Sequence, residues 1–113
     1  MEFDKALLSG SNALLLLSLL RDGDKYGYEM VQELKRRSKN VFAMKEGTLY
    51  PLLHALENAG EVSSYYRTAA TGRERRYYHL TEKGEQRFRE REKEWRTFSE
   101  SVNTVLNTMP VMG

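Results

Sequence analysis

The chain contains no cysteine, which excludes disulfide bonds and zinc sites built from thiolates. Residues typical of catalytic sites are scarce as well. There are two histidines, His54 and His79, and neither belongs to a metal-binding or nucleophile arrangement. The 113 residues suit one domain with a modest core rather than a large multi-domain enzyme. We therefore expect a protein that is not an enzyme and that needs neither a metal nor another cofactor.

No hydrophobic run is long enough for a membrane span. The longest run, ALLLLSLL at residues 13–20, falls far short of the roughly 18 to 20 residues required. It also differs from a signal peptide, because Glu2 and Asp4 precede it and no small-residue cleavage site follows it. The run is expected to be a buried helix of a cytoplasmic protein that does not bind a membrane.

A strong charge of one sign is also missing, since 18 Lys and Arg face 16 Asp and Glu. The basic residues are nevertheless dense in two places, KRRSK at residues 35–39 and RERR at residues 73–76. Such patches are compatible with nucleic-acid binding. Cations in the last turn of a helix also favour the helix dipole, so the first patch has an equally good structural explanation.

Four helices are predicted from the apolar periodicity and from residues that favour helix ends. They span about residues 4–20, 26–38, 47–59 and 82–109. Asp24 and Thr81 are expected to cap the second and the last helix, and Gly60 to end the third. Pro110 is expected to stop the last helix.

The third helix has two chemically different faces. Its leucines, at positions 49, 52, 53 and 56, have the spacing of one buried stripe. The opposite face includes Pro51 and His54 and carries no acidic side chain, so it can lie against an anionic surface. Because proline lacks an N–H, the regular helix is expected to start near Gly47 or Thr48. With the helix before it, this segment forms a helix-turn-helix pattern.

A hairpin is predicted directly after this pattern, as in a winged helix-turn-helix. Residues 62–66 and 75–80 are rich in strand formers, and RTAATGRE between them has the Thr and Gly content of a hairpin loop. The loop region is basic through Arg67, Arg73, Arg75 and Arg76. Ordinary solvated surface charge is the alternative explanation for these arginines. Alternation along the second strand places Tyr78 and Leu80 on the core side.

The last helix carries an apolar seam that needs a partner. Residues at the a and d spacing of a coiled coil are Phe88, Trp95, Phe98, Val102, Val105 and Met109. A helix of about 28 residues extends roughly 40 Å, too far for the preceding body to cover. The C-terminal half of the first helix is apolar almost all round and also needs cover. We expect a homodimer whose interface contains Leu14, Leu17, Trp95, Phe98, Val102, Val105, Leu106 and Met109.

The expected fold class is therefore mainly α with a small β-hairpin. Residues 1–81 are expected to form a winged helix-turn-helix DNA-binding domain, whose first helix also contributes to the dimer. Residues 82–113 are expected to form a C-terminal dimerisation helix.

Three segments together resemble the PadR family of transcriptional regulators. They are GYE at residues 27–29, GTLYPLLHALENAGEV at residues 47–62 and GRERRYYHLTEKGEQ at residues 72–86. The single C-terminal helix is similar to the short-tailed branch, which includes multidrug-sensing repressors. The resemblance implies a homodimer that binds a pseudo-palindromic double-stranded operator and represses transcription until a small molecule or another signal releases it. A winged-helix module that binds protein rather than DNA is the alternative.

The resemblance also implies site residues. Those expected to contact DNA are Lys39, Lys45, Thr48, Tyr50, Pro51, His54, Arg73, Arg75 and Arg76. Those expected around a planar aromatic or cationic ligand are Asn12, Phe88, Trp95, Phe98 and Ser99. Aromatic faces stack on flat molecules and attract cations. Trp95 serves either as such a platform or as dimer core, and both interpretations stay open.

Overall fold

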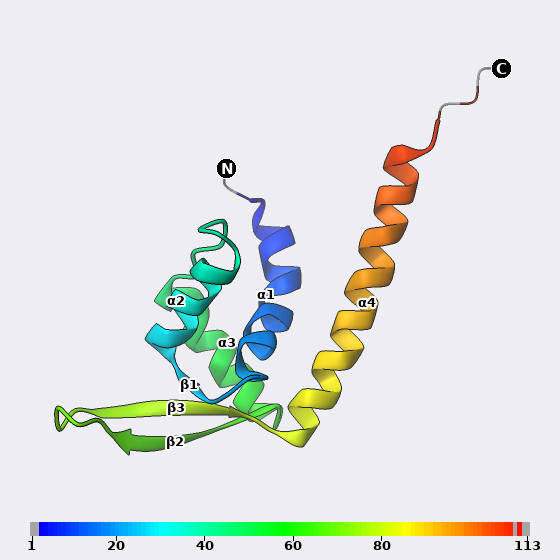
Figure 1. Cartoon of the computed structure of the whole chain (residues 1–113). Coiled ribbons are helices and arrows are strands. Elements are labelled where there is room, and N and C mark those ends of the chain that lie inside the picture. Colours follow the sequence, from blue (N-terminus) through cyan, green and yellow to red (C-terminus); the bar gives the residue numbers. More distant parts are fainter. Residues whose placement is uncertain (1–2, 110, 112–113) are drawn as a thin grey trace.

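The computed structural model describes residues 3–109 and 111, which form four helices and a three-stranded sheet (Figure 1). In chain order the elements are α1 (Lys5–Leu20), β1 (Lys25–Tyr26), α2 (Gly27–Arg37), α3 (Glu46–Asn58), β2 (Val62–Thr68), β3 (Glu74–Leu80) and α4 (Glu82–Asn107). The predicted fold class is confirmed. α4 ends at Asn107 rather than Met109, and the expected stop, Pro110, lies outside the described residues.

The sheet is antiparallel throughout, with the strand order β1-β3-β2. β2 and β3 form the predicted hairpin, which we call the wing (residues 62–80). β1 is the strand that was not predicted, and it places Tyr26 opposite Tyr77, which in turn lies opposite Tyr65. The rings of Tyr65 and Tyr77 are stacked, with centroids 5.7 Å apart, and Tyr26 meets Tyr77 edge to face at 5.5 Å. This row of tyrosines joins the base of the wing to the start of α2.

The core lies above the sheet, where α1 packs between the helix-turn-helix and α4 (Figure 1). Its buried members are Leu16, Leu17, Leu19, Leu20, Met30, Leu34, Met44, Leu49, Leu53, Leu56, Val62, Tyr78 and Phe88. The predicted leucine stripe of α3 therefore faces inward, although Leu52 is only half-buried. Tyr78 is buried as expected, and Leu80 packs against the cluster at its edge. Burial raises the pKa of the Tyr78 hydroxyl above its ordinary value.

Two of the expected partner-facing residues belong to this core instead. Leu17 has no exposed surface and Phe88 is 3% exposed, so neither can reach a second chain or a ligand between chains. The reason is that α1 and the first half of α4 pack against each other within one chain, and the guanidinium of Arg21 covers the Phe88 ring at 4.6 Å. The expectations that placed Leu17 in the dimer interface and Phe88 in the ligand site were wrong.

Most of the predicted helix caps are present in the structure. Thr81 caps α4, because its side chain accepts a hydrogen bond from the Gly84 N–H. Gly60, with φ of +77°, ends α3 in a Schellman motif, in which the Glu61 N–H donates to the Leu56 carbonyl at 2.9 Å. Asp24 does not cap α2, because β1 intervenes and its carboxylate turns to the sheet.

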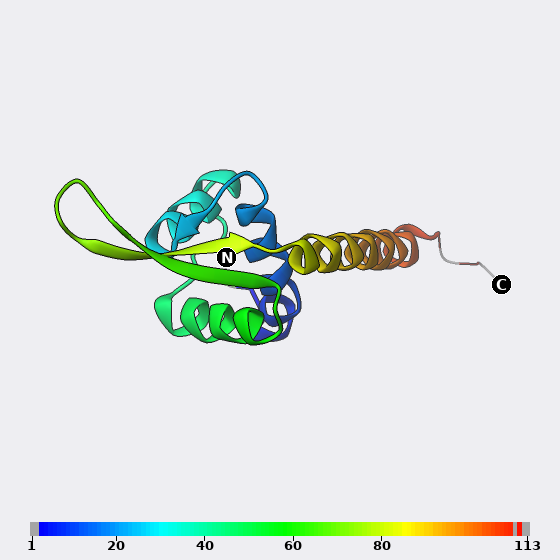
Figure 2. The ribbon, with the colours of Figure 1, turned by 90° about the horizontal axis from the view of Figure 1, so that it is seen from below.

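The molecule is elongated because α4 projects from the body. Its radius of gyration is 17.0 Å, whereas a compact domain of this length has about 13 Å. Figure 2 shows that the wing and α4 extend from opposite sides of the helical body. Within residues 3–109, no helix combines the length and the hydropathy that crossing a membrane requires.

Candidate nucleic-acid interface

The face of α3 opposite its leucine stripe is exposed and free of acidic side chains. Pro51, His54 and Asn58 all lie on it, and Thr48 on its flank is exposed as well. The nearby acids are placed elsewhere: Glu46 sits toward α2, and Glu57 is half-buried beside the wing. An exposed helical face of this size and composition fits the major groove of DNA.

α3 begins one residue earlier than the proline suggested. Lys45 has an extended backbone, and its carbonyl accepts from the N–H groups of Thr48 and Leu49 at 3.0 and 2.9 Å. Pro51 consequently lies inside the helix, where it leaves the carbonyl of Gly47 without its usual intrahelical donor. Glu46 occupies the first turn and favours the helix dipole. A phosphate would meet this acid at the helix start, so the exposed side face is the better candidate for DNA contact.

Tyr50 braces α3 against α2. Its side chain is 45% exposed, but its hydroxyl lies only 2.6 Å from the position that a Cβ atom on Gly27 would occupy. Gly27, the first residue of α2, is therefore needed for this approach. The role of Tyr50 in the helix-turn-helix is at least partly structural, which the sequence pattern did not indicate.

The wing arginines differ in how firmly they are held. Arg73 is exposed near the tip, beside Gly72 with φ of +84°, and no side-chain partner is assigned to it among residues 3–109. Arg75 lies over the Tyr26 ring at 4.5 Å and donates to the Tyr26 hydroxyl at 2.9 Å. Of these two side chains, Arg73 has the freedom to follow a DNA backbone.

Arg76 is tied to α3. Its Nη2 donates to Glu57 Oε1 at 2.8 Å and its Nε to Ser64 Oγ at 3.0 Å. Ser64 in turn donates to the other oxygen of Glu57 at 2.5 Å. This closed network fixes the wing against the C-terminal part of α3. Neither Glu57 nor Ser64 was predicted as part of the site, because a cross-element network leaves no periodic pattern in the sequence.

Asp24 and His79 form a second polar cluster on the outer side of the sheet. The Tyr65 hydroxyl donates to Asp24 Oδ2 at 2.7 Å, and His79 Nδ1 lies 2.8 Å from Oδ1. Burial alone would raise the pKa of Asp24, but the hydrogen bonds from Tyr65 and His79 outweigh it and hold the pKa below its ordinary value. Asp24 is therefore a carboxylate that secures the base of the wing. His79 is its neighbour in that structural cluster.

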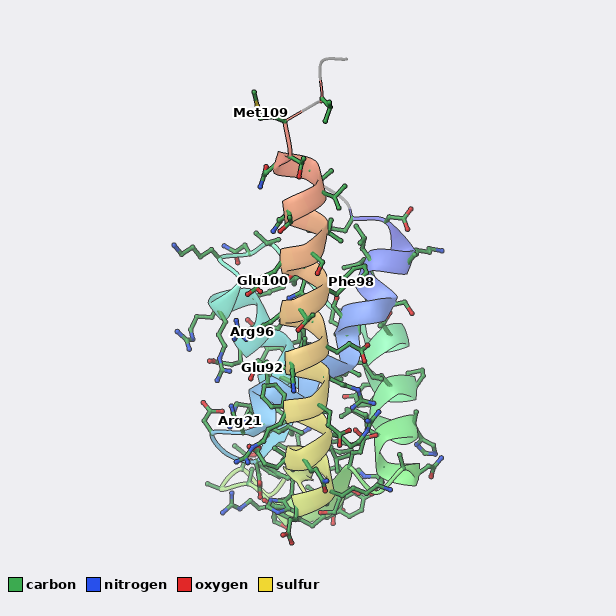
Figure 3. All side chains as sticks on the ribbon, turned by 90° about the vertical axis from the view of Figure 1, so that its right-hand side faces the viewer. Arg21, Glu92, Arg96, Phe98, Glu100 and Met109 are labelled. Atoms are coloured by element: carbon green, nitrogen blue, oxygen red, sulfur yellow. The ribbon has the colours of Figure 1, made fainter. Side chains whose placement is uncertain are left out.

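The second half of α4 presents an uncovered apolar face. Phe98 is 61% exposed, Val105 74% and Trp95 44%. Val102 and Leu106 are also exposed, as is Met109 just beyond the end of the helix. Figure 3 shows Phe98 on one side of α4, whereas Glu92, Arg96 and Glu100 lie on the other. Arg96 pairs with Glu92 at 3.1 Å within the helix. The apolar seam predicted from the sequence is thus present from Trp95 onward and absent at Phe88.

The remaining ligand candidates, Asn12 and Ser99, lie on two different helices. Asn12 is half-buried on α1, as is the expected interface residue Leu14, and the Ser99 hydroxyl donates to the carbonyl of Arg96 in its own helix. A shallow, open depression lies beside Phe98, and its lining includes Glu90 and Glu94. These acids were not among the predicted site residues. Their i, i+4 spacing along α4 was the available sign of a shared face.

The helix-turn-helix, the basic wing packed beside it and the projecting apolar helix define a winged helix-turn-helix protein. Residues 16–90 match the Transcriptional regulator PadR-like family, and the chain belongs to that family.

Solved structures of transcriptional regulators and one curated protein are similar to the chain. A transcriptional regulator from Clostridium thermocellum is 31% identical with a TM-score of 0.82, over 88% of this chain and 97% of that one. A PadR family transcriptional regulator from Eggerthella lenta is 32% identical with a TM-score of 0.80, over 92% and 88%. An uncharacterized protein of Lysinibacillus sphaericus is 34% identical over 97 residues, covering 86% of this chain and 89% of its own.

Family membership decides between the functions that the sequence left open. Proteins of this family regulate transcription, so the chain is a DNA-binding transcriptional regulator and not an enzyme. The same assignment favours DNA over a protein as the target of the winged helix.

Proposed function

We propose that the protein is a homodimeric repressor, which binds a two-fold operator and is released by a planar aromatic or cationic molecule. The observation that carries this proposal is the uncovered apolar face of α4. Large exposed apolar surfaces on a soluble chain mark interaction sites. A second α4 is the simplest cover, because the a and d spacing of Trp95, Phe98, Val102 and Val105 is self-complementary in a coiled coil.

In this proposal the two parts of the chain have different functions. Residues 1–81 bind DNA and residues 82–113 dimerise, with Leu14 on α1 adding to the interface. The exposed DNA contacts are Lys39, Lys45, Thr48, Pro51, His54 and Arg73. Tyr50, Arg75 and Arg76 shape the surface from their braced positions. Two DNA-binding units would then meet half-sites about one helical turn apart.

Replacing Arg73 with glutamine tests the DNA contact. Affinity for a fragment from the protein's own upstream region should fall roughly fivefold, because one phosphate contact and its counterion release are lost. The slope of log affinity against log salt should become shallower by about 1. Gel shifts at several salt concentrations measure both quantities.

The matched control for Arg73 is Arg89→Gln, which removes the same charge from an exposed site on α4. It should leave both the affinity and the slope unchanged. If Arg73→Gln kept the wild-type slope of log affinity against log salt, Arg73 would not be a DNA contact.

Trp95 provides a test of ligand release, because it is the sole tryptophan and is 44% exposed in one chain. A planar cationic dye that stacks between two α4 helices should quench the Trp95 emission saturably, by roughly half or more. The quenching should disappear in a dimerisation-defective variant, since one chain supplies only one wall of the site. Unchanged emission at saturating dye would exclude Trp95 as a ligand platform.

A further inference from the structure

We propose that the ion pair between Glu61 and Arg91 is a positioning device that selects the spacing between operator half-sites. It sets the direction in which α4 leaves the DNA-binding unit, and thereby the separation of the two α3 helices in a dimer. This inference rests on the proposed dimeric repressor. It concerns two residues that touch neither DNA nor the partner in that proposal.

The root of α4 is in backbone contact with the chain that follows α3. A Cβ atom on Gly84 would lie 2.9 Å from the carbonyl carbon of Glu61 and would press into its oxygen, so the first turn of α4 sits directly on this peptide. Thr81 adds two hydrogen bonds, from its N–H to the Glu61 carbonyl at 3.2 Å and from its hydroxyl to the Gly60 carbonyl at 2.6 Å. These contacts hold the position of the root and leave its tilt to be fixed by contacts further along the helix.

Arg91 makes the decisive contact further along. Its guanidinium donates to both carboxylate oxygens of Glu61, with the longer bond at 3.5 Å. Among the hydrogen bonds of residues 3–109, those of Arg91 are the furthest along α4 that reach another part of the chain. The side-chain bonds beyond them stay within α4 and its C-cap residue Thr108. Glu61 also belongs to the Schellman turn of α3. The pair therefore connects the dimer helix to the end of the candidate DNA-reading helix.

The burial of the Glu61 carboxylate favours an orienting role. Glu61 is 4% exposed, whereas the Arg91 side chain keeps 27% of its surface exposed, so it is mainly the carboxylate that loses its hydration. An ion pair with a buried member contributes little net stability, because the attraction must offset this loss. Its directional requirement is strict, however, since a tilt of α4 would leave a buried carboxylate without its partner. The salt bridge from Arg21 to Glu85 restrains the other side of the root.

A small tilt of α4 changes the distance between the two DNA-binding units of a dimer. Val102, in the middle of the apolar seam, lies about 27 Å beyond Gly84 along the helix. A tilt of about 5° at the root moves it by roughly 2.5 Å, and the two-fold axis doubles this to roughly 5 Å between the DNA-binding units. Successive base pairs are about 3.4 Å apart, so such a tilt corresponds to between one and two base pairs.

The test uses the full chain and DNA selected by it. The wild-type protein first selects its consensus from a randomised double-stranded library. That consensus is then rebuilt with one base pair inserted or removed between the half-sites, and the affinities are compared. Wild type should bind the rebuilt sites at least about tenfold more weakly. Arg91→Gln should reduce this difference to about twofold, while Arg91→Lys, which keeps the charge, should retain part of it.

Arg96→Gln is the control, because within residues 3–109 the Arg96 side chain pairs only with Glu92 in its own helix and does not fix the direction of α4. It should keep the wild-type spacing preference. Sedimentation and thermal melting establish that each variant is a folded dimer; if Arg91→Gln fails to fold, Glu61→Gln and Arg91→Lys take its place.

An equal loss of affinity on all spacings, or an unchanged preference, would overturn the inference and show that the pair only stabilises the fold. A wild-type consensus without paired half-sites would overturn the proposed dimeric function, and the inference with it.

Discussion

Replacing Gly84 with alanine is expected to destabilise the protein by about 3 kcal/mol. On helix propensity alone, alanine would be the better residue by about 1 kcal/mol, because glycine loses more backbone entropy. The structure reverses this preference. The new methyl group would lie 2.7 Å from Leu80 Cδ1 and would overlap the Glu61 carbonyl, which is backbone and cannot rotate away. Urea unfolding at a fixed chain concentration measures the effect.

Gly10 offers a matched control in the same chain. It lies inside α1, and a Cβ atom there would meet nothing within 4 Å. Gly10→Ala should therefore stabilise the protein by up to about 1 kcal/mol, as propensity predicts. If Gly84→Ala were as stable as the wild type, α4 would not pack against the Glu61 peptide as described.

Replacing Phe98 with glutamate should raise the dimer dissociation constant at least about 100-fold, which corresponds to roughly 2.7 kcal/mol. Each new carboxylate would have to leave water at the seam, and two-fold symmetry would bring two of them close together. The chain itself should stay folded, because Phe98 is 61% exposed and contributes little to the core. Sedimentation equilibrium measures the dissociation constant, and gel shifts measure the accompanying loss of operator affinity.

Asn103→Glu introduces the same charge on α4, away from the a and d positions, and should leave the dimer intact. A Phe98→Glu chain that remains dimeric at wild-type concentrations would contradict a seam through Phe98. In that case the apolar face would have to be covered by something other than a second α4.

Local features of the sequence predicted most elements of the fold. The leucine stripe of α3, the Thr81 cap and the Gly60 helix end depend on residues within a turn or two of each other, and all three are present. β1 was missed because two residues are too short for any alternating pattern. Its position is determined by pairing with β3, which is distant in sequence.

The DNA-binding and dimer sites were harder to predict, because the same residue type can pack in the core of its own chain or contact another molecule. Leu17 and Phe88 have the apolar character of interface residues, yet they fill the core of their own chain. Periodicity identifies an apolar face but not the surface that covers it. Similarly, Arg76 fits a basic wing in composition, whereas its position is determined by Glu57 and Ser64 on two other elements.

The exposed face of α4 has a consequence for how the regulator responds to its own abundance. If two chains must meet before both half-sites are occupied, dimer concentration rises with the square of chain concentration while monomers predominate. Operator occupancy would then rise more steeply than gene dosage. A cell that halves its supply of the protein would lose more than half of its dimers, so for the proposed repressor dilution during growth would itself relieve the promoter.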